Sequence, residues 1–232
     1  TVDDFDMVDG KWKLKEGVAD ATEVVGANYM RPGARKFKDL SGDGKITTDD
    51  ADKEIIGNAL PDWTGGLIIS GWIGGFDYSA NFNGVFGNEI YNANKIEFTS
   101  TRKYNYRNLL NTMTVENRWT NVDWTTGELV NDPDKLAEMN AGKTEGSPMI
   151  YNAAFSDDAV ESGSFVRLAS VTLGYTFPEK LTKRAGIQSL RIYATGSNLF
   201  CWTNYSGYDP EVDSRRSTPL TPGVDYSAYP KS

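Results

Sequence analysis

Two long runs of alternating side chains follow one another in the first half of the chain. In WTGGLIISGWI, residues 63–73, the odd positions form an apolar face and the even positions are mixed; in FDYSANFNGVFG, residues 76–87, the even positions are apolar. The Gly74–Gly75 dipeptide between them suits a two-residue hairpin turn, because glycine readily takes positive φ. Side chains of a strand point alternately to opposite faces, so these runs predict an antiparallel hairpin with one apolar face.

Two more strands are predicted nearer the end of the chain, at about 164–177 and 189–200. In the first, the apolar positions are Ala169, Val171, Leu173, Tyr175 and Phe177, with a less regular phase around Arg167. In the second, Leu190, Ile192, Ala194 and Gly196 alternate with Arg191, Tyr193, Thr195 and Ser197. Pro178 ends the first of these strands, because proline donates no ladder hydrogen bond. The chain is also rich in both glycine and aromatic residues, and together with the alternating pattern this composition predicts an all-β chain with long loops.

An alternating strand has two interpretations, a soluble β-sandwich or a transmembrane β-barrel. The predicted strands run about 11 to 14 residues, against about 5–6 in most globular proteins and about 9–11 for a tilted transmembrane strand. Aromatic residues also gather at the strand ends, as the interfacial girdles of a barrel require. They are Trp63 and Phe86 at one edge, and Phe76, Tyr78, Tyr175 and Phe177 at the other. Length and girdles favour the barrel, and the sandwich stays open as the alternative.

Composition excludes several functions. The chain has no histidine and a single cysteine, Cys201, which removes Ser-His-Asp and Cys-His nucleophiles, zinc clusters and an internal disulfide. A net charge of −8 without a basic run argues against nucleic acid. The acidic pairs Asp49–Asp50 and Asp157–Asp158 lack a predicted pocket, so a glycosidase fragment is disfavoured. We therefore expect no catalytic residues and no enzyme activity.

Five blocks of sequence, in order, cover the chain from about residue 35 to its end. They are FKDLSGDGKITTDD with IIGNALPDW, then GFDYSANFNGVFGNEIYN, SGSFVRLASVTLGYTFP, SLRIYATGSNLFCWTNYSGYDPEV and GVDYSAYP. This succession resembles the C-terminal part of SusC/RagA-type TonB-dependent outer-membrane transporters. The resemblance implies a segment of an antiparallel, 22-stranded transmembrane barrel with a plugged lumen and long external loops. It also implies that the plug, the TonB box, the signal peptide and the closing strand lie outside this sequence.

The resemblance assigns a place to each part of the chain. External loops would occupy 1–62, 88–162 and 201–232, the last of them before the missing final strand; a barrel hairpin would occupy 63–87, and two barrel strands 163–200. The turns at 74–75 and 178–188 would be periplasmic. The implied location is the cell outer membrane. The implied partners are outer-membrane lipid, a SusD-like surface lipoprotein, the TonB complex through the missing N-terminal part, and an oligosaccharide or peptide cargo. The alternative function is a secreted, calcium-stabilised β-sandwich that binds carbohydrate.

An Asp-rich loop, DLSGDGKITTDD at 39–50, matches the spacing of an EF-hand calcium loop. The predicted ligands are Asp39, Ser41, Asp43, the carbonyl of Lys45, and Asp50. Asp50 stands where an EF-hand has a longer, bidentate Glu, so we expect modest affinity and a structural role for the calcium. The alternative is a metal-free turn that caps a short helix beginning at Thr47 or Thr48. Another short helix is predicted in PDKLAEMNAG, residues 133–142.

Loop aromatics are the candidate cargo-binding residues, because their flat apolar rings can stack on sugars. They are Trp119, Trp124, Trp202, Tyr205 and Tyr208. The alternative is loop packing or contact with the lipoprotein. Polar residues predicted to face the lumen would line a cargo path or hold the plug; they are Asp77, Asn81, Asn83, Arg191, Tyr193 and Ser197.

Overall fold

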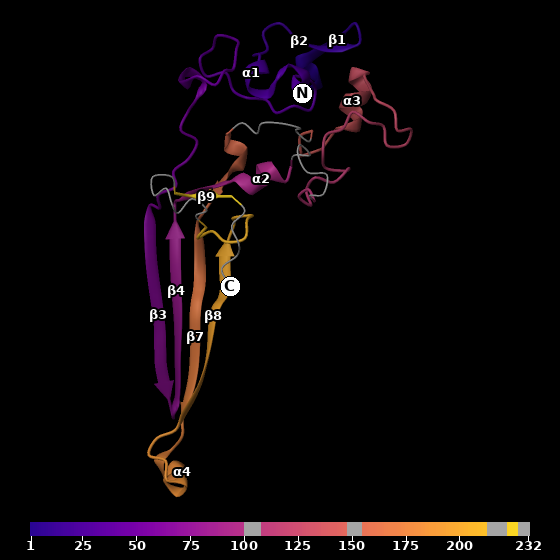
Figure 1. Ribbon diagram of the computed structural model, residues 1–232. Helices are drawn as coiled ribbons and strands as arrows, with labels where there is room; N and C mark the ends of the chain where they lie inside the picture. Colours follow the sequence, from indigo (N-terminus) through magenta and orange to yellow (C-terminus); the bar gives the residue numbers. More distant parts are fainter. Residues whose placement is uncertain (100–107, 148–154, 213–221, 227–232) are drawn as a thin grey trace. The chain divides into compact units, whose positions relative to one another are not determined.

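The computed structural model describes residues 1–99, 108–147, 155–212 and 222–226 (Figure 1). The remaining parts of the predicted loops 88–162 and 201–232, with the end of GVDYSAYP, lie outside the described residues. The chain divides into two compact units. Unit 1 comprises Thr1–Ile56 and Lys95–Asp157, and unit 2 comprises Gly57–Asn94 and Asp158–Ser232.

Unit 2 is built on a four-stranded antiparallel sheet in the order β3-β4-β7-β8, whose strands lie side by side in Figure 1. The strands are β3 (Trp63–Ile73), β4 (Phe76–Phe86), β7 (Phe165–Thr176) and β8 (Arg191–Thr203). The prediction of these strands from alternation is therefore correct to within about three residues at each end, the usual precision of such bounds. The prediction ended the last strand too early, at residue 200.

The β3–β4 hairpin keeps one register along its whole length, from Trp63 opposite Phe86 to Ile73 opposite Phe76. Gly74 and Gly75 both have positive φ, +55° and +100°, as a tight two-residue turn requires. This register places the odd residues of β3 on the same face as the even residues of β4. The two predicted apolar faces thus form one surface.

A bulge interrupts the regular register of β7 between Leu168 and Ser170. Ala169 has no partner on β4, since Asn81 pairs with Ser170 and Phe82 with Leu168. On β8, Asn198 takes the left-handed conformation, with φ +52°, in which asparagine is tolerated. The extra residue inverts the alternation, so Leu168 joins the apolar face and Arg167 the polar one. The prediction that Ala169 continues the apolar row is wrong for this reason.

Shorter elements complete unit 2. A three-stranded sheet has the order β6-β5-β9, antiparallel between β5 and β6 and parallel between β5 and β9. Its strands are β5 (Glu89–Asn92), β6 (Val160–Ser162) and β9 (Val224–Asp225). The β7–β8 connection holds α4 (Glu179–Thr182) and the 3-10 turn η5 (Lys183–Ala185). Two short elements span the division between the units, α2 (Ala93–Glu97) and η4 (Asp157–Ala159).

Unit 1 consists mainly of loops around short elements. They are η1 (Val2–Asp4), β1 (Phe5–Val8), β2 (Lys11–Leu14), α1 (Thr22–Val25), η2 (Ala27–Tyr29), η3 (Asp50–Asp52) and α3 (Pro133–Met139). The helix predicted in 133–142 is thus present, and the Asp132 side chain caps it by accepting from the Lys135 amide. A small apolar core comprises Ala21, Val25 and Ile46.

Candidate functional site

One face of the four-stranded sheet is a continuous apolar surface. Neighbours in the ladder carry apolar side chains together, for example Ile69, Ala80 and Val171 in adjacent strands. These side chains point away from the unit: Leu67 is 57%, Leu173 61% and Ile192 59% exposed. A surface of this size on a water-soluble chain would be covered by another layer. In the described residues it is open, which argues against the β-sandwich.

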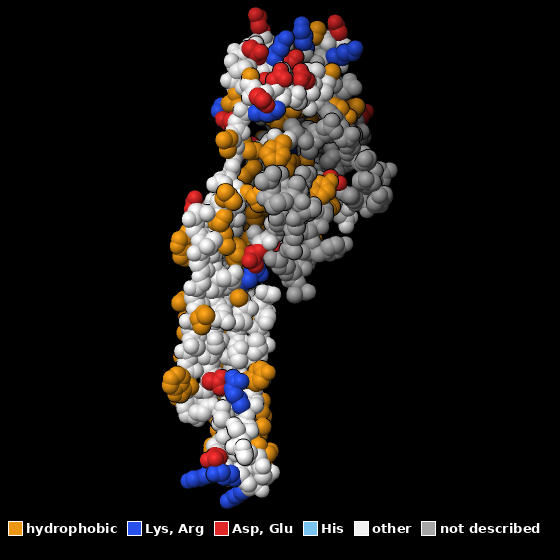
Figure 2. Space-filling view, turned by 60° about the vertical axis from the view of Figure 1, so that its left-hand side comes forward, with side chains coloured by type: hydrophobic (Ala, Val, Ile, Leu, Met, Phe, Trp, Pro, Cys, Tyr) orange, Lys and Arg blue, Asp and Glu red, His pale blue; other side chains and the backbone are white. Residues whose placement is uncertain are grey.

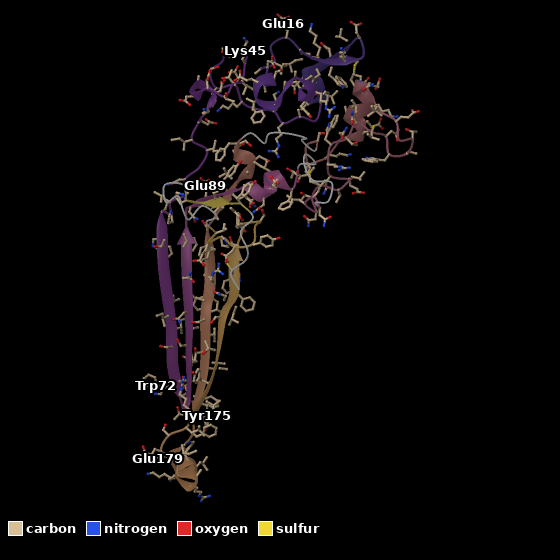
Figure 3. The ribbon with its side chains drawn as sticks, viewed as in Figure 1. Glu16, Lys45, Trp72, Glu89, Tyr175 and Glu179 are labelled. Carbon is tan, nitrogen blue, oxygen red and sulfur yellow. The ribbon has the colours of Figure 1, made fainter. Side chains whose placement is uncertain are left out.

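Aromatic side chains border this apolar face at both ends of the strands. At one end, the Trp63 and Phe86 rings lie 5.3 Å apart and the Phe200 and Trp202 rings 6.0 Å apart. At the other end, Tyr175 contacts Phe76 at 4.5 Å and Phe177 at 4.9 Å between ring centroids. Figure 3 shows Tyr175 at this second end, next to the turn that carries Glu179. Trp72 lies at the same end, but it pairs with Asp77 on the opposite face. Two aromatic bands around an apolar face are the pattern of a transmembrane barrel wall.

The opposite face is mainly polar on β4, β7 and β8, and its side chains bond across the strands; on β3 it is mixed, because Ile68 and Trp72 lie on it. Asn81 donates to the Ser170 hydroxyl at 2.8 Å, and the Thr172 and Thr195 hydroxyls lie 3.0 Å apart. Asp77 of β4 accepts two hydrogen bonds from the Arg191 guanidinium of β8. Asp77 and Arg191 were predicted to share this face with Asn83, Tyr193 and Ser197, and the strand register places all of them there.

A buried ion cluster holds the chain that follows β8 against this polar face, near the start of β7. Arg167 of β7 is only 7% exposed, and its Nη2 donates to Asp209 Oδ1 at 2.6 Å. Its Nε lies 3.1 Å from Glu211 Oε2, an ion pair without hydrogen-bond alignment. The guanidinium also lies over the Phe165 ring, 5.4 Å from its centre. Because a buried charge must be paired, this cluster fixes the 209–211 segment against the sheet.

A second buried contact joins the chain that follows β8 to the three-stranded sheet. The Tyr205 hydroxyl donates to Asp225 Oδ2 at 2.6 Å, and Asp225 in β9 is fully buried. Burial, and next the bond to the carboxylate, raise the pKa of the Tyr205 phenol far above its ordinary value. Beside it, Glu161 accepts from both the amide and the hydroxyl of Ser206. No local sequence pattern indicates these contacts, since twenty residues separate Tyr205 from Asp225.

In unit 1, the Asp-rich loop is held by its own hydrogen bonds. Asp39 accepts from the amides of Gly42 at 2.7 Å and Gly44 at 2.9 Å, and these bonds hold the pKa of its carboxyl below the usual value. Asp43 accepts from the Lys45 amide at 2.8 Å. The loop is also joined to residue 20, where the Ile46 amide donates to the Asp20 carbonyl while the Ile46 side chain enters the core. These hydrogen bonds hold the loop, whose residue spacing matches that of a calcium site, in a defined turn conformation.

The last predicted ligand does not point into this loop. Asp50 pairs with Lys53 at 3.0 Å and is fully exposed. Asp52 takes its place, accepting from the Ser41 amide and from the amide and hydroxyl of Thr47. The short helix expected after Thr47 or Thr48 is the single 3-10 turn η3, and the Thr47 hydroxyl accepts from the Asp49 amide just before it. Within the described residues no three His, Cys, Asp or Glu side chains form a cluster that could hold a metal ion.

The five candidate cargo aromatics occupy different environments. In unit 1, the Trp119 ring packs over Gly33, where a Cβ would lie 2.4 Å from it, and the exposed Trp124 lies beneath the Arg118 guanidinium. In unit 2, Tyr208 is 75% exposed and Tyr205 is buried. Trp202 was expected in a loop, but β8 extends through Thr203, and Trp202 lies on the apolar face in the aromatic band. Trp124, Trp202 and Tyr208 are therefore exposed, and of these three Trp124 and Tyr208 lie outside the four-stranded sheet.

Helices offer no membrane span: over the described ranges none is both long and apolar enough to cross a bilayer.

No family model matches the chain, but individual proteins do. Two proteins of Formosa agariphila named TonB-dependent receptors are 30% identical over 203 residues and 32% identical over 210 residues, covering 86% and 87% of this chain. SusC, a TonB-dependent receptor of Bacteroides thetaiotaomicron, is 28% identical over 207 residues, 87% of this chain. The chain spans only 17–18% of the length of these relatives.

Solved structures show the same fold. The RagAB peptide importer in its closed-closed state aligns over 79% of this chain and 17% of the solved chain, with a TM-score of 0.58 at 22% identity. Its open-open state aligns over 77% of this chain and 17% of that one, with a TM-score of 0.53 at 21% identity. The chain is therefore a homologue of part of the TonB-dependent receptors. The chain is thus similar to part of SusC, as the five sequence blocks indicated, and it shares the fold of part of the RagAB importer.

Proposed function

We propose that this chain forms part of the wall of a TonB-dependent transmembrane barrel in the bacterial outer membrane. The observation that carries the proposal is the open apolar face of β3, β4, β7 and β8, bordered by aromatic bands. Strands of 11 to 13 residues extend roughly 36–43 Å, and at a tilt of about 45° they cover the apolar band of about 25 Å. The apolar face would contact lipid, and the polar face would line the lumen.

The edges of the sheet support membership in a larger barrel. Among the described residues, β3 and β8 each pair with one strand, so there one side of each presents its backbone groups without a ladder partner. In a bilayer those groups must pair with further strands, and closure into a barrel is the arrangement that does so. The 22-stranded barrel remains part of this proposal.

Import is the function that such a wall would serve. SusC and the RagAB importer, among the similar proteins, support a transporter that works with a SusD-like surface lipoprotein and takes energy from TonB. The cargo would be an oligosaccharide or a peptide. The exposed rings of Trp124 and Tyr208 are the remaining candidates for contact with cargo or lipoprotein, and the 39–50 loop would have a structural role.

A pair of charge substitutions at neighbouring positions tests the wall. In the intact protein, Ile69→Arg places a charge on the apolar face near the middle of β3, and Ser70→Arg places the same charge on the polar face. A cation on the lipid face costs about 2–4 kcal/mol at mid-membrane, whereas a lumen position tolerates it. We expect loss of the folded, heat-modifiable form in outer-membrane fractions for Ile69→Arg alone. Equal tolerance of both substitutions would refute the proposal.

A further inference from the structure

The connection between β7 and β8, here called the α4 turn (Pro178–Leu190), is longer than the sheet requires. Two glycines suffice to join the neighbouring strands β3 and β4. The α4 turn instead contains a helical turn and a 3-10 turn, α4 and η5. It has an internal structure: Thr182 is buried, and its carbonyl accepts from the Ile187 amide at 3.1 Å. An ordered helical connection at this position suggests a function beyond linking two strands.

The α4 turn exposes apolar side chains at its surface. Leu181 is 59% exposed, and Ile187 and Leu190 are also exposed. The turn follows directly on the aromatic band of Tyr175 and Phe177, at the end of the sheet where Figure 3 shows Trp72 and Tyr175. The exposed apolar side chains thus lie next to the aromatic border of the sheet, where in the proposed barrel the bilayer would change from acyl chains to headgroups.

Basic side chains accompany these apolar ones. Lys180, Lys183 and Arg184 are all exposed, and Glu179 is the single acidic residue in the sequence of the turn. Glu179 pairs with Lys183 at 3.0 Å, an exposed i,i+4 pair that leaves a net positive charge. Figure 2 shows Lys and Arg side chains gathered at this tip of the molecule. The whole chain carries a formal charge of −8, so the net charge of the α4 turn is opposite in sign to that of the chain.

We propose that the α4 turn binds anionic phospholipid headgroups of the leaflet at its end of the barrel. The inference rests on the proposed function, because it needs the sheet to span a bilayer. Exposed Leu181 would enter the headgroup boundary while the three basic side chains pair with lipid phosphates, the combination by which interfacial segments bind anionic membranes. A lipid is favoured over a soluble protein partner because the turn follows directly on the aromatic band of Tyr175 and Phe177.

Lipid titration of the intact protein in detergent micelles tests the proposal. The probes are fluorescent phosphatidylglycerol and fluorescent phosphatidylcholine. The variant K180Q/K183Q/R184Q should weaken phosphatidylglycerol binding by at least about tenfold and leave phosphatidylcholine unchanged, given the contribution of each basic residue at an anionic surface. A charge-conserving variant, K180R/K183R, should bind as the wild type does. The matched control, K11Q/K13Q/K15Q, removes three exposed lysines of unit 1 and should change nothing.

Each other outcome has a separate meaning. Unchanged phosphatidylglycerol binding in the glutamine variant would overturn the inference while leaving the barrel wall intact. Equal weakening for both lipids would overturn the charge-based recognition. Lack of lipid preference in the wild type, together with a periplasmic protein crosslinked to the turn, would replace the lipid by a protein partner. Failure of the wild type to enter micelles or bilayers as a folded barrel would instead contradict the proposed function itself.

Discussion

The Arg191 guanidinium bonds to the Asp77 carboxylate across a strand that lies between them. Arg191 Nε lies 3.0 Å from Asp77 Oδ1, and Nη2 donates to Oδ2, although β8 and β4 are both paired to β7 and not to each other. The residue beneath this contact is Gly174. A Cβ there would lie 2.5 Å from the Arg191 Nη2 and 2.6 Å from both Asp77 oxygens. The missing side chain is therefore what allows the two charges to meet.

Gly174→Ala should separate this pair and destabilise the barrel by about 1 kcal/mol, the upper range for a partly exposed, bidentate ion pair. Gly66→Ala is the matched control, since among the described residues its Cβ would meet only the Phe82 carbonyl, at 3.5 Å. Urea unfolding of the intact protein in micelles gives both values. A Gly174→Ala midpoint equal to that of the control would show that the contact does not need the glycine.

Arg167→Met should destabilise the intact protein by about 3–5 kcal/mol, because it leaves the buried Asp209 charge without its partner. The loss should be much smaller in Arg167→Met/Asp209→Asn, in which neither charge remains. Limited proteolysis should cut the 205–212 segment faster in the single variant. If the single and double variants lose equal stability, the two side chains are not coupled.

Stability should decline in alkali through Tyr205. Its folded pKa lies above the unfolded value of about 10, so the stabilisation is fully present below that pH and is lost as the pH rises through and above it. Tyr205→Phe should unfold more easily at neutral pH, by about 1–3 kcal/mol, because the buried Asp225 Oδ2 loses this donor. The variant should also lack the decline of the unfolding free energy at alkaline pH. The slope of unfolding free energy against pH in the two proteins checks this.

Two neighbouring carboxylates of the Asp-rich loop should differ in how much they stabilise the loop. Asp52 accepts from three donors of the loop, and the largest contribution, the Thr47 amide, lowers the pKa of its carboxyl; Asp50 is exposed beside Lys53. Asp52→Ala should therefore loosen the loop, and Asp50→Ala should not. The pKa of the Asp39 carboxyl is lowered too, so the support from both carboxylates should be lost below about pH 4. Hydrogen exchange of the 39–52 amides measures both effects.

Calcium binding by this loop stays a prediction. Calorimetry of the intact protein with calcium should give a binding heat that Asp43→Ala abolishes, with transport retained, if the metal has the structural role expected of it. Absence of any heat in the wild type would leave the loop as a metal-free turn. A heat that survives Asp43→Ala would place the calcium elsewhere.

Alternation of side chains predicted the four long strands because each follows a period of two that the whole sheet imposes. The same reasoning failed where one residue interrupts the period: the bulge at Ala169 turns Arg167 inward, and the prediction noticed only an irregular phase. Trp202 was placed in a loop because the irregularity at Asn198 and Leu199 breaks the alternation of β8 before the strand ends. The Tyr205–Asp225 and Arg167–Asp209 contacts could not be predicted, since pairing of distant polar residues is decided by the fold.

Site-directed spin labelling tests most directly whether this sheet is a membrane wall. In the intact protein with Cys201→Ser, labels at Leu173→Cys and Thr172→Cys probe opposite faces of one interior strand at almost the same depth. The account predicts that the label at 173 relaxes strongly with oxygen, which concentrates in lipid, and weakly with a water-soluble nickel chelate, while the label at 172 does the reverse. Two labels equally accessible to the nickel chelate in bilayers would contradict the account.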